Sequence, residues 1–214
     1  MDGPVGEIIE TSVAEFTSQA CRFGEAPPFA SFVKAELAER TVYGLVYAIH
    51  SGSLDPGGRP VMRGRDGLRD AQIYAENPDL EQVLRTEFTA LAIGFAEYET
   101  PPGGGGSNGA YATSSARRSA FRPYLPPQPP PLHWSVRACS TDETVRLTDG
   151  LGYFRTVLDA PHVPADALLS ASIRLARAAR VDEPAFGVRA GRELASLLRR
   201  DYPRLSAILR TLAP

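Results

Sequence analysis

The stretch that begins at Val5 decides the fold of this chain. It reads VGEIIETSVAEFTSQACRF from Val5, PPFASFVKAE from Pro27 and TVYGLVYAI from Thr41. These short segments are rich in β-branched and aromatic residues, and turn residues separate them, which is typical of consecutive β-strands. The pattern predicts a small β-barrel in the N-terminal part of the protein.

The same reasoning predicts where individual strands and helices lie. Val5 to Ala20 predicts one or two strands with a bend near Thr11 and Ser12. Further strands are expected at Phe29 to Ala35, Thr41 to His50 and Thr89 to Ala96, with Gly44 suited to a bulge or a barrel corner. Between them, Asp79 to Phe88 predicts a helix, because Leu80, Val83, Leu84 and Phe88 follow a helical period.

The composition changes sharply after residue 99. Residues 100–118 are mostly Gly, Ser and Pro, which predicts a flexible loop or linker. Arg122 to Pro131 is stiff polyproline, which we interpret as a rigid strap, with a ligand for an aromatic groove as the alternative. Leu132 to Cys139 then resumes a strand-like pattern.

Amphipathic helices dominate the C-terminal third. Three are expected, at Pro164 to Arg180, Pro184 to Arg200 and Pro203 to Leu212. The predicted fold class is therefore α+β, an N-terminal small β-barrel with a C-terminal unit of about three amphipathic helices. The predicted domain boundaries are 1–99 for the barrel, 100–131 for the loop and strap, and 132–214 for the strand segment and helices.

Composition and charge limit the classes of protein to which this chain can belong. The apolar fraction of 43% suffices for a buried core, and no apolar run approaches the ~18 residues of a membrane span. The start, MDGPVGEIIE, lacks the pattern of a signal peptide, so a cytoplasmic location is expected. Cys21 and Cys139 are then expected to be reduced thiols, with a disulfide between them as the alternative.

The net charge of −2 hides an asymmetry between the two halves. Residues 1–100 carry 8 basic and 16 acidic residues, whereas residues 101–214 carry 15 basic and 9 acidic residues. An acidic and a basic half can attract each other or different partners. Lys34 is the only lysine of the chain, and the other basic residues are arginines.

The N-terminal segments resemble a known family. The opening G-E-x-x-E-x-x-x-x-E-F-T from Gly6, the strand V-Y-G-x-V from Val42 and the text VLRTEFTALAIGF from Val83 are similar to the HAS-barrel. This small barrel is shared by HerA-type DNA-translocating ATPases and ATP synthase catalytic subunits, and the resemblance covers about residues 5–97. The whole chain also resembles stand-alone HAS-barrel proteins that carry PPQPP and VPADxLLxASIR text.

The resemblance implies an assembly and partner-docking role and no catalytic residue. A translocating ATPase needs a phosphate-binding loop that ends in GK[ST], but Ala35 and Glu36 follow Lys34 here. The run from Gly103 to Gly106 also lacks the lysine. We therefore expect that the chain alone does not hydrolyse ATP.

No other catalytic or metal-binding pattern stands out, and we expect neither a cofactor nor a metal. His50, His133 and His162 lie far apart in sequence without ligands at zinc spacing. Glu7, Glu10 and Glu15 fit a solvated strand face better than an acid–base pair. No nucleophile motif appears either, so the sequence predicts a protein that is not an enzyme.

Two residue sets are candidates for binding. Arg189, Arg192, Arg199 and Arg200 would share one face of a helix and could contact nucleic acid, although Glu193 interrupts that face and a solvated surface is the plainer interpretation. His133 and Trp134 follow the strap and could form an interface, with Trp134 as a packing anchor as the alternative. We further expect Leu132 to Ala138 to pair with the barrel and bury Trp134.

The leading functional expectation is therefore a non-catalytic interaction module. It would dock to a protein partner, in a DNA-processing or ATPase assembly by analogy with the other hosts of the barrel. The alternative is a nucleic-acid-binding accessory protein that uses the C-terminal arginine face.

Overall fold

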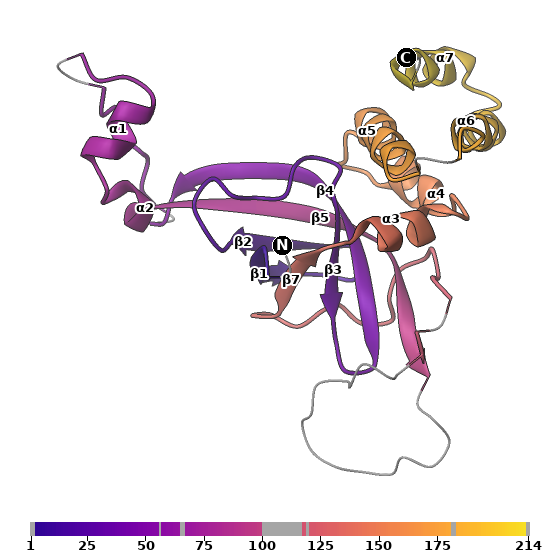
Figure 1. Ribbon diagram of the computed structural model, residues 1–214, viewed down its shortest axis with the longest axis horizontal. Coiled ribbons are helices and arrows are strands. Elements are labelled where there is room, and N and C mark those ends of the chain that lie inside the picture. The colour runs from indigo at the N-terminus through magenta and orange to yellow at the C-terminus, as the bar shows by residue number, and fades with distance from the viewer. Residues whose placement is uncertain are drawn as a thin grey trace, which may run out of the picture.

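A closed antiparallel β-barrel forms the centre of the computed structural model of this protein (Figure 1). The structure describes residues 3–55, 57–64, 67–99, 117–118, 120–180 and 183–212. The strands are β1 (Gly6–Thr11), β2 (Glu15–Ala20), β3 (Phe32–Glu36), β4 (Arg40–Ser53), β5 (Leu84–Glu99), β6 (Arg117–Arg118) and β7 (Ser135–Ala138). The helices are α1 (Ala71–Glu76), α2 (Leu80–Val83), α3 (Thr141–Thr148), α4 (Tyr153–Asp159), α5 (Ala165–Ala178), α6 (Phe186–Leu197) and α7 (Tyr202–Leu212).

Six strands close the barrel in the order β1, β2, β5, β4, β3 and β7. Each neighbouring pair is antiparallel, and β7 returns to β1 to complete the ring. β6 adds two residues at the end of β5. The predicted barrel is therefore confirmed, and Leu132 to Ala138 does pair with it, because β7 lies between β1 and β3.

The barrel wall separates two hydrophobic cores, because side chains of a strand alternate between its faces. Val42 and Val46 of β4 point into the barrel interior, where they join Ile8 and Phe16. Tyr43 and Leu45 point outward instead and pack with the helices. The sheet is thus buried on both faces where the helices cover it.

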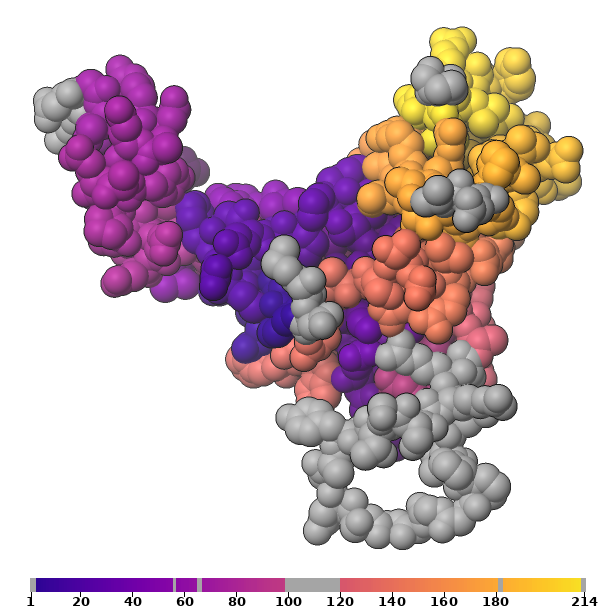
Figure 2. Space-filling model, viewed as in Figure 1, coloured from indigo at the N-terminus to yellow at the C-terminus, as the bar shows by residue number. Residues whose placement is uncertain are grey.

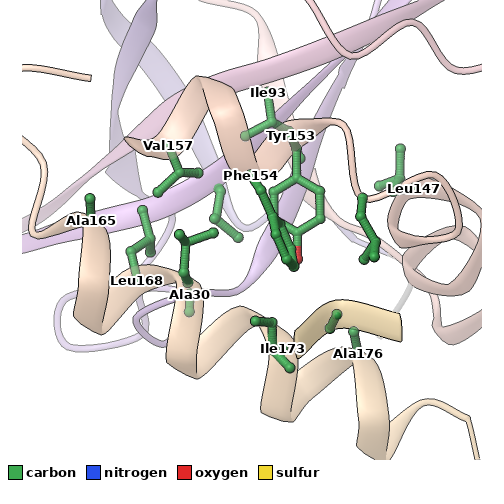
Figure 3. Packing of buried hydrophobic residues seen from close by; sticks show 14 of the residues in the cluster. Ala30, Ile93, Leu147, Tyr153, Phe154, Val157, Ala165, Leu168, Ile173 and Ala176 are labelled. Carbon is green, nitrogen blue, oxygen red and sulfur yellow. The ribbon is translucent and has the colours of Figure 1, made fainter. Parts of the chain in front are cut away.

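The outer core is built around α4. Figure 3 shows Tyr153 and Phe154 of this helix between Ile93 of β5 and the apolar side of α5, which carries Leu168, Ile173 and Ala176. The Tyr153 and Phe154 rings meet edge to face, with centroids 4.9 Å apart. Burial raises the pKa of Tyr153. The hydrogen bond between its hydroxyl and Ser172 Oγ, at 3.1 Å, acts in the opposite direction and is the smaller effect.

The three expected C-terminal helices correspond to α5, α6 and α7, and the structure adds α3 and α4 before them. On α5, the expected apolar side is buried at Leu168, Leu169, Ser172, Ile173 and Ala176. α6 ends at Leu197, so the predicted continuation to Arg200 is wrong. α3 had a recognisable signal, because Ser140 and Glu143 form a capping box.

The predicted helix from Asp79 to Phe88 is largely wrong. α2 covers only Leu80 to Val83, and β5 begins at Leu84. From there the chain pairs with β4, and from Glu87 also with β2, so tertiary pairing overrides the helical spacing. The buried residues Thr86, Phe88 and Ala90 follow the period of a strand.

Two further sequence predictions have different outcomes. Gly44 lies at a register shift between β4 and β5, as expected for a bulge. The predicted flexible segment 100–118 lies outside the described residues except for β6, and the predicted boundaries at residues 99 and 131 stay a prediction. β7 lies after those boundaries and nevertheless completes the barrel.

Candidate functional site

A projecting arm is the most conspicuous surface feature of the molecule. We define the arm as residues 54–83, which connect β4 to β5 and include α1 and α2. Figure 1 shows the arm at the far end of these strands, well away from the helices at the C-terminus. Leu54 N donates a hydrogen bond to Val83 O at 2.8 Å, which closes the base of the arm.

The arm exposes large apolar side chains to solvent. Met62 is 80% exposed, Val61 is 73% exposed and Tyr74 is 50% exposed. None of the residues of α1 is buried. Val61 and Met62 are adjacent in the sequence, and soluble proteins seldom expose neighbouring large apolar side chains without a binding role, so this surface is a candidate docking site.

A ring contact joins the arm to the segment after β2, because the Tyr74 ring lies 6.0 Å from the Phe23 ring. Arg63 pairs with Asp79 at 3.5 Å, and both residues belong to the arm. Sequence reasoning missed the arm. Its one signal is the pair Val61 and Met62, which stands alone among polar and turn residues.

A hollow in the surface separates the arm from the C-terminal helices. Figure 2 shows the surface hollowed between the arm and the helices α5 to α7, with residues of the barrel as its floor. The bent β4 and β5 hairpin carries the arm away from the barrel (Figure 1). A partner in this hollow would touch the barrel, the arm and the helices at once.

A groove of about 590 Å³ lies beside α4. Apolar residues of three segments line it, among them Leu91 of β5, Pro123 and Tyr124 of the strap, and Val163 after α4. The charged residues at the groove include Glu15, Arg155 and Asp159, and Arg155 pairs with Asp159 at 3.5 Å. Its size suits a small ligand or a short peptide.

The candidate arginines divide into two groups. Arg189 pairs with Glu183 at 2.9 Å and lies over the Phe186 ring, so its charge is already compensated. Arg192, Arg199 and Arg200 are exposed, and no described acid pairs with them. Because α6 ends before Arg199, the last two lie in the following turn, and nucleic-acid contact stays a prediction.

His133 and Trp134 are placed at the barrel wall. His133 is exposed, and its Nδ1 lies 2.7 Å from Glu7 Oε1. Trp134 is partly buried against the barrel core and donates from Nε1 to Glu36 O at 2.7 Å. The expected burial of Trp134 is thus partial, and its role in an interface stays a prediction.

In the described part of the chain, no three or more His, Cys, Asp or Glu side chains come together as metal ligands. No described helix has the length and apolar character to cross a bilayer. Cys21 and Cys139 are not joined in a disulfide.

The comparisons with known proteins give no family assignment. No protein-family model matches the chain, and no curated protein is significantly similar to it in sequence.

Proposed function

We propose that this protein is a non-catalytic assembly module that docks to a protein partner through its arm. The observation that carries the proposal is the exposure of Val61, Met62 and Tyr74, the last of which lies in α1, a helix with no buried residue. A six-residue helix is too short to be stable on its own in water. A partner would bury these side chains and supply the packing that α1 lacks.

The barrel supports a further part of the proposal. Six antiparallel strands in a closed ring are compatible with a HAS-barrel, which the segments from Gly6 and Val42 resemble. We propose on this basis that the partner belongs to a DNA-processing or ATPase assembly. This step is an analogy at the level of the fold.

Affinity purification from the source cells tests the docking role. The tagged protein is compared with a variant that combines Val61→Asp and Met62→Asp. A charge placed in a desolvated contact is costly, so the variant should lose the partner by at least about tenfold in recovered amount. A second variant with Val188→Asp and Tyr202→Asp makes a similar change at exposed sites of α6 and α7 and should retain it.

Equal recovery of every co-purifying protein by the parent and the arm variant would remove the arm from the proposal. Circular dichroism of both variants establishes that each is folded. The absence of any protein retained at high salt would count against a stable protein partner altogether.

A second candidate function is nucleic-acid binding by the arginine face. The exposed guanidinium groups of Arg192, Arg199 and Arg200, without paired acids in the described chain, favour it. Binding that depends on phosphates should weaken steeply as salt increases. Arg192→Glu with Arg199→Glu should then abolish binding, whereas Arg22→Glu with Arg59→Glu, an equal charge change on the barrel and arm, should have a smaller effect.

A further inference from the structure

The groove beside α4 has no part in the docking role proposed for the arm. It measures about 590 Å³, which is within the range of sites for drug-sized ligands. Its floor lies on the outer face of the barrel, where Glu15 of β2 and Leu91 of β5 are register partners. Residues directly opposite each other in antiparallel strands share one face, so the Glu15 carboxylate stands beside an apolar floor.

The walls of this groove belong to packed elements. Phe154 and Val157 turn one side of α4 into the outer core (Figure 3), which leaves Thr156 on the side of the groove. The strap supplies another wall, and Pro123 approaches α4 so closely that a Cβ at Gly152 would lie 2.6 Å from the proline ring. The groove is therefore formed before a ligand arrives, which lowers the ordering cost of binding.

Tyr124 gives the strap wall an aromatic surface. Its ring packs edge to face against Phe95, with centroids 5.3 Å apart, and the side chain is nevertheless 53% exposed. Ala160 and Val163 add aliphatic surface from the segment after α4. An aromatic or branched aliphatic body would bury this apolar surface, and its removal from water favours binding.

The charges around the groove favour a cation. Arg155 and Asp159 pair with each other at 3.5 Å, so together they add no net charge. Glu15 forms no ion pair with a described basic residue, and its Oε2 accepts a hydrogen bond from Tyr47 at 2.7 Å. Burial, this hydrogen bond and the charges of Glu15 and Glu10 raise the pKa of Tyr47, and no described basic group opposes the shift.

We propose that this groove binds a small-molecule cation, an amine attached to an aromatic or branched aliphatic body. The ammonium group would pair with Oε1 of Glu15, since Tyr47 already binds Oε2, and the body would lie on Leu91 between Tyr124 and Val163. One uncompensated carboxylate in a groove of this volume suits a single charged ligand better than a polypeptide, whose stable interfaces bury about 800 Å² on each side. The proposal goes beyond the docking role of the arm and does not depend on it.

Three ligands of one shape test the sign of the charge. The probes are naphthylethylamine, the neutral naphthylethanol and the anionic naphthylpropanoate, each titrated by calorimetry into the full-length protein near neutral pH. The amine should bind most tightly and the acid most weakly, because only the ammonium group can pair with Glu15. Methyl NMR spectra should place the bound amine beside Leu91 and Val163.

A variant of Glu15 tests whether this carboxylate selects the amine. Glu15→Gln keeps the shape of the side chain and an oxygen for the Tyr47 hydrogen bond, but it removes the charge. It should weaken binding of the amine by about fivefold, because one partly exposed charge pair is lost, and leave binding of the alcohol unchanged. Glu81→Gln removes the same charge from the arm and should leave both affinities unaltered.

A variant of Thr156 tests whether the ligand occupies the groove. Thr156→Phe places a ring in the groove and should abolish binding of both the amine and the alcohol. Thr156→Ser leaves the groove open and should bind both ligands as the parent does. Circular dichroism establishes that each variant is folded.

Several results would overturn the inference. They are no binding of the amine, equal affinity of the amine and the alcohol, and amine binding that survives Glu15→Gln or Thr156→Phe undiminished. Tighter binding of the acid would assign the selection to Arg155 or His162 and reject a cation. A shift of the Leu91 and Val163 methyl signals on dilution of the free protein would assign the groove to a second copy of the chain instead. None of these results depends on the arm variants, so the docking function stands or fails separately.

Discussion

Lys34 joins the barrel to the first C-terminal helix through a buried pair of charges. Its Nζ donates to Glu143 of α3 at 2.8 Å and to Glu36 of β3 at 3.0 Å. The side chains of Lys34 and Glu143 are only 13% and 8% exposed. Burial opposes the charge of Lys34, but the two carboxylates outweigh it, so the pKa of Lys34 is raised.

Lys34→Met should therefore destabilise the fold by about 3–5 kcal/mol, because it leaves Glu143 buried without a counter-charge. Chemical denaturation measures the loss. Adding Glu143→Met should restore part of the free energy of unfolding, since no lone charge then remains. A loss below about 1 kcal/mol for Lys34→Met alone would mean that water compensates Glu143.

The same pair predicts how stability depends on pH. Because the pKa of Lys34 is higher in the folded state than in the unfolded state, its contribution is full below about pH 10.4, the unfolded value. It is lost as the pH rises through the folded pKa. The parent protein should thus lose more stability in strongly alkaline solution than the Lys34→Met, Glu143→Met double variant, as measured by urea unfolding across that range.

The barrel interior leaves no room for a side chain at Gly44. A Cβ at this position would lie 2.8 Å from the Phe16 ring and 2.9 Å from Ala90 Cβ, and all three positions are buried. Gly44→Ala should overpack the barrel and cost about 1–3 kcal/mol of stability. Gly150→Ala is the matched control, because nothing lies within 4 Å of the added Cβ; an equal effect of the two substitutions in thermal unfolding would refute this explanation.

At the scale of elements, the Pro-rich strap is held where it crosses β5. Arg122 exchanges backbone hydrogen bonds with Phe95, at 2.8 and 3.1 Å, and its guanidinium pairs with Glu97 at 2.9 Å. The Phe121 ring packs edge to face on Tyr43. Gly94 permits this approach, because a Cβ there would collide with Arg122 O and the Phe121 ring.

Gly94→Ala should release the strap from the sheet. The clash with backbone cannot be relieved by a side-chain rotation, so Arg122 and Phe121 must move. Amide exchange at Phe95 and Arg122 should become faster, and the melting temperature should fall by several degrees. Unchanged protection of Arg122 in the variant would show that the strap is fixed elsewhere.

The elements also show which sequence signals are reliable. The first strands were predictable because β-branched and aromatic residues are grouped between turn residues, and α5 was predictable because its apolar positions repeat at the helical period. The helix prediction for Asp79 to Phe88 was wrong because its four apolar residues at helical spacing also fit a strand. The partners of that strand, β4 and β2, are distant from it in sequence. The arm was not predictable, since exposed Val61 and Met62 have no periodic partner.

At the scale of the whole molecule, the strands β3, β4 and β5 belong to both cores. Their inward side chains fill the barrel, and Phe32, Leu45 and Ile93 pack outward against the helices. The helices therefore cannot separate without exposing the outer face of the sheet. This shared wall predicts one cooperative unfolding transition for barrel and helices.

Trp134, the only tryptophan, makes this prediction measurable. It reports the barrel, while far-UV circular dichroism reports mainly the helices. The two signals should change at the same denaturant concentration, and Trp134→Ala should shift both midpoints together. Two separate midpoints would mean that the helices unfold independently of the barrel.

The sequence by itself determined the class of the fold, because local periodicity and turn residues depend only on neighbouring positions. It also determined that no GK[ST] loop is present, since that motif is a local pattern. Only the tertiary structure decided that β7 closes the barrel, that Lys34 meets Glu143, and that β5, the strap and α4 line one groove. These features join residues as far apart in sequence as Gly6 and Val136, and chain closure and packing, which no local pattern encodes, bring them together.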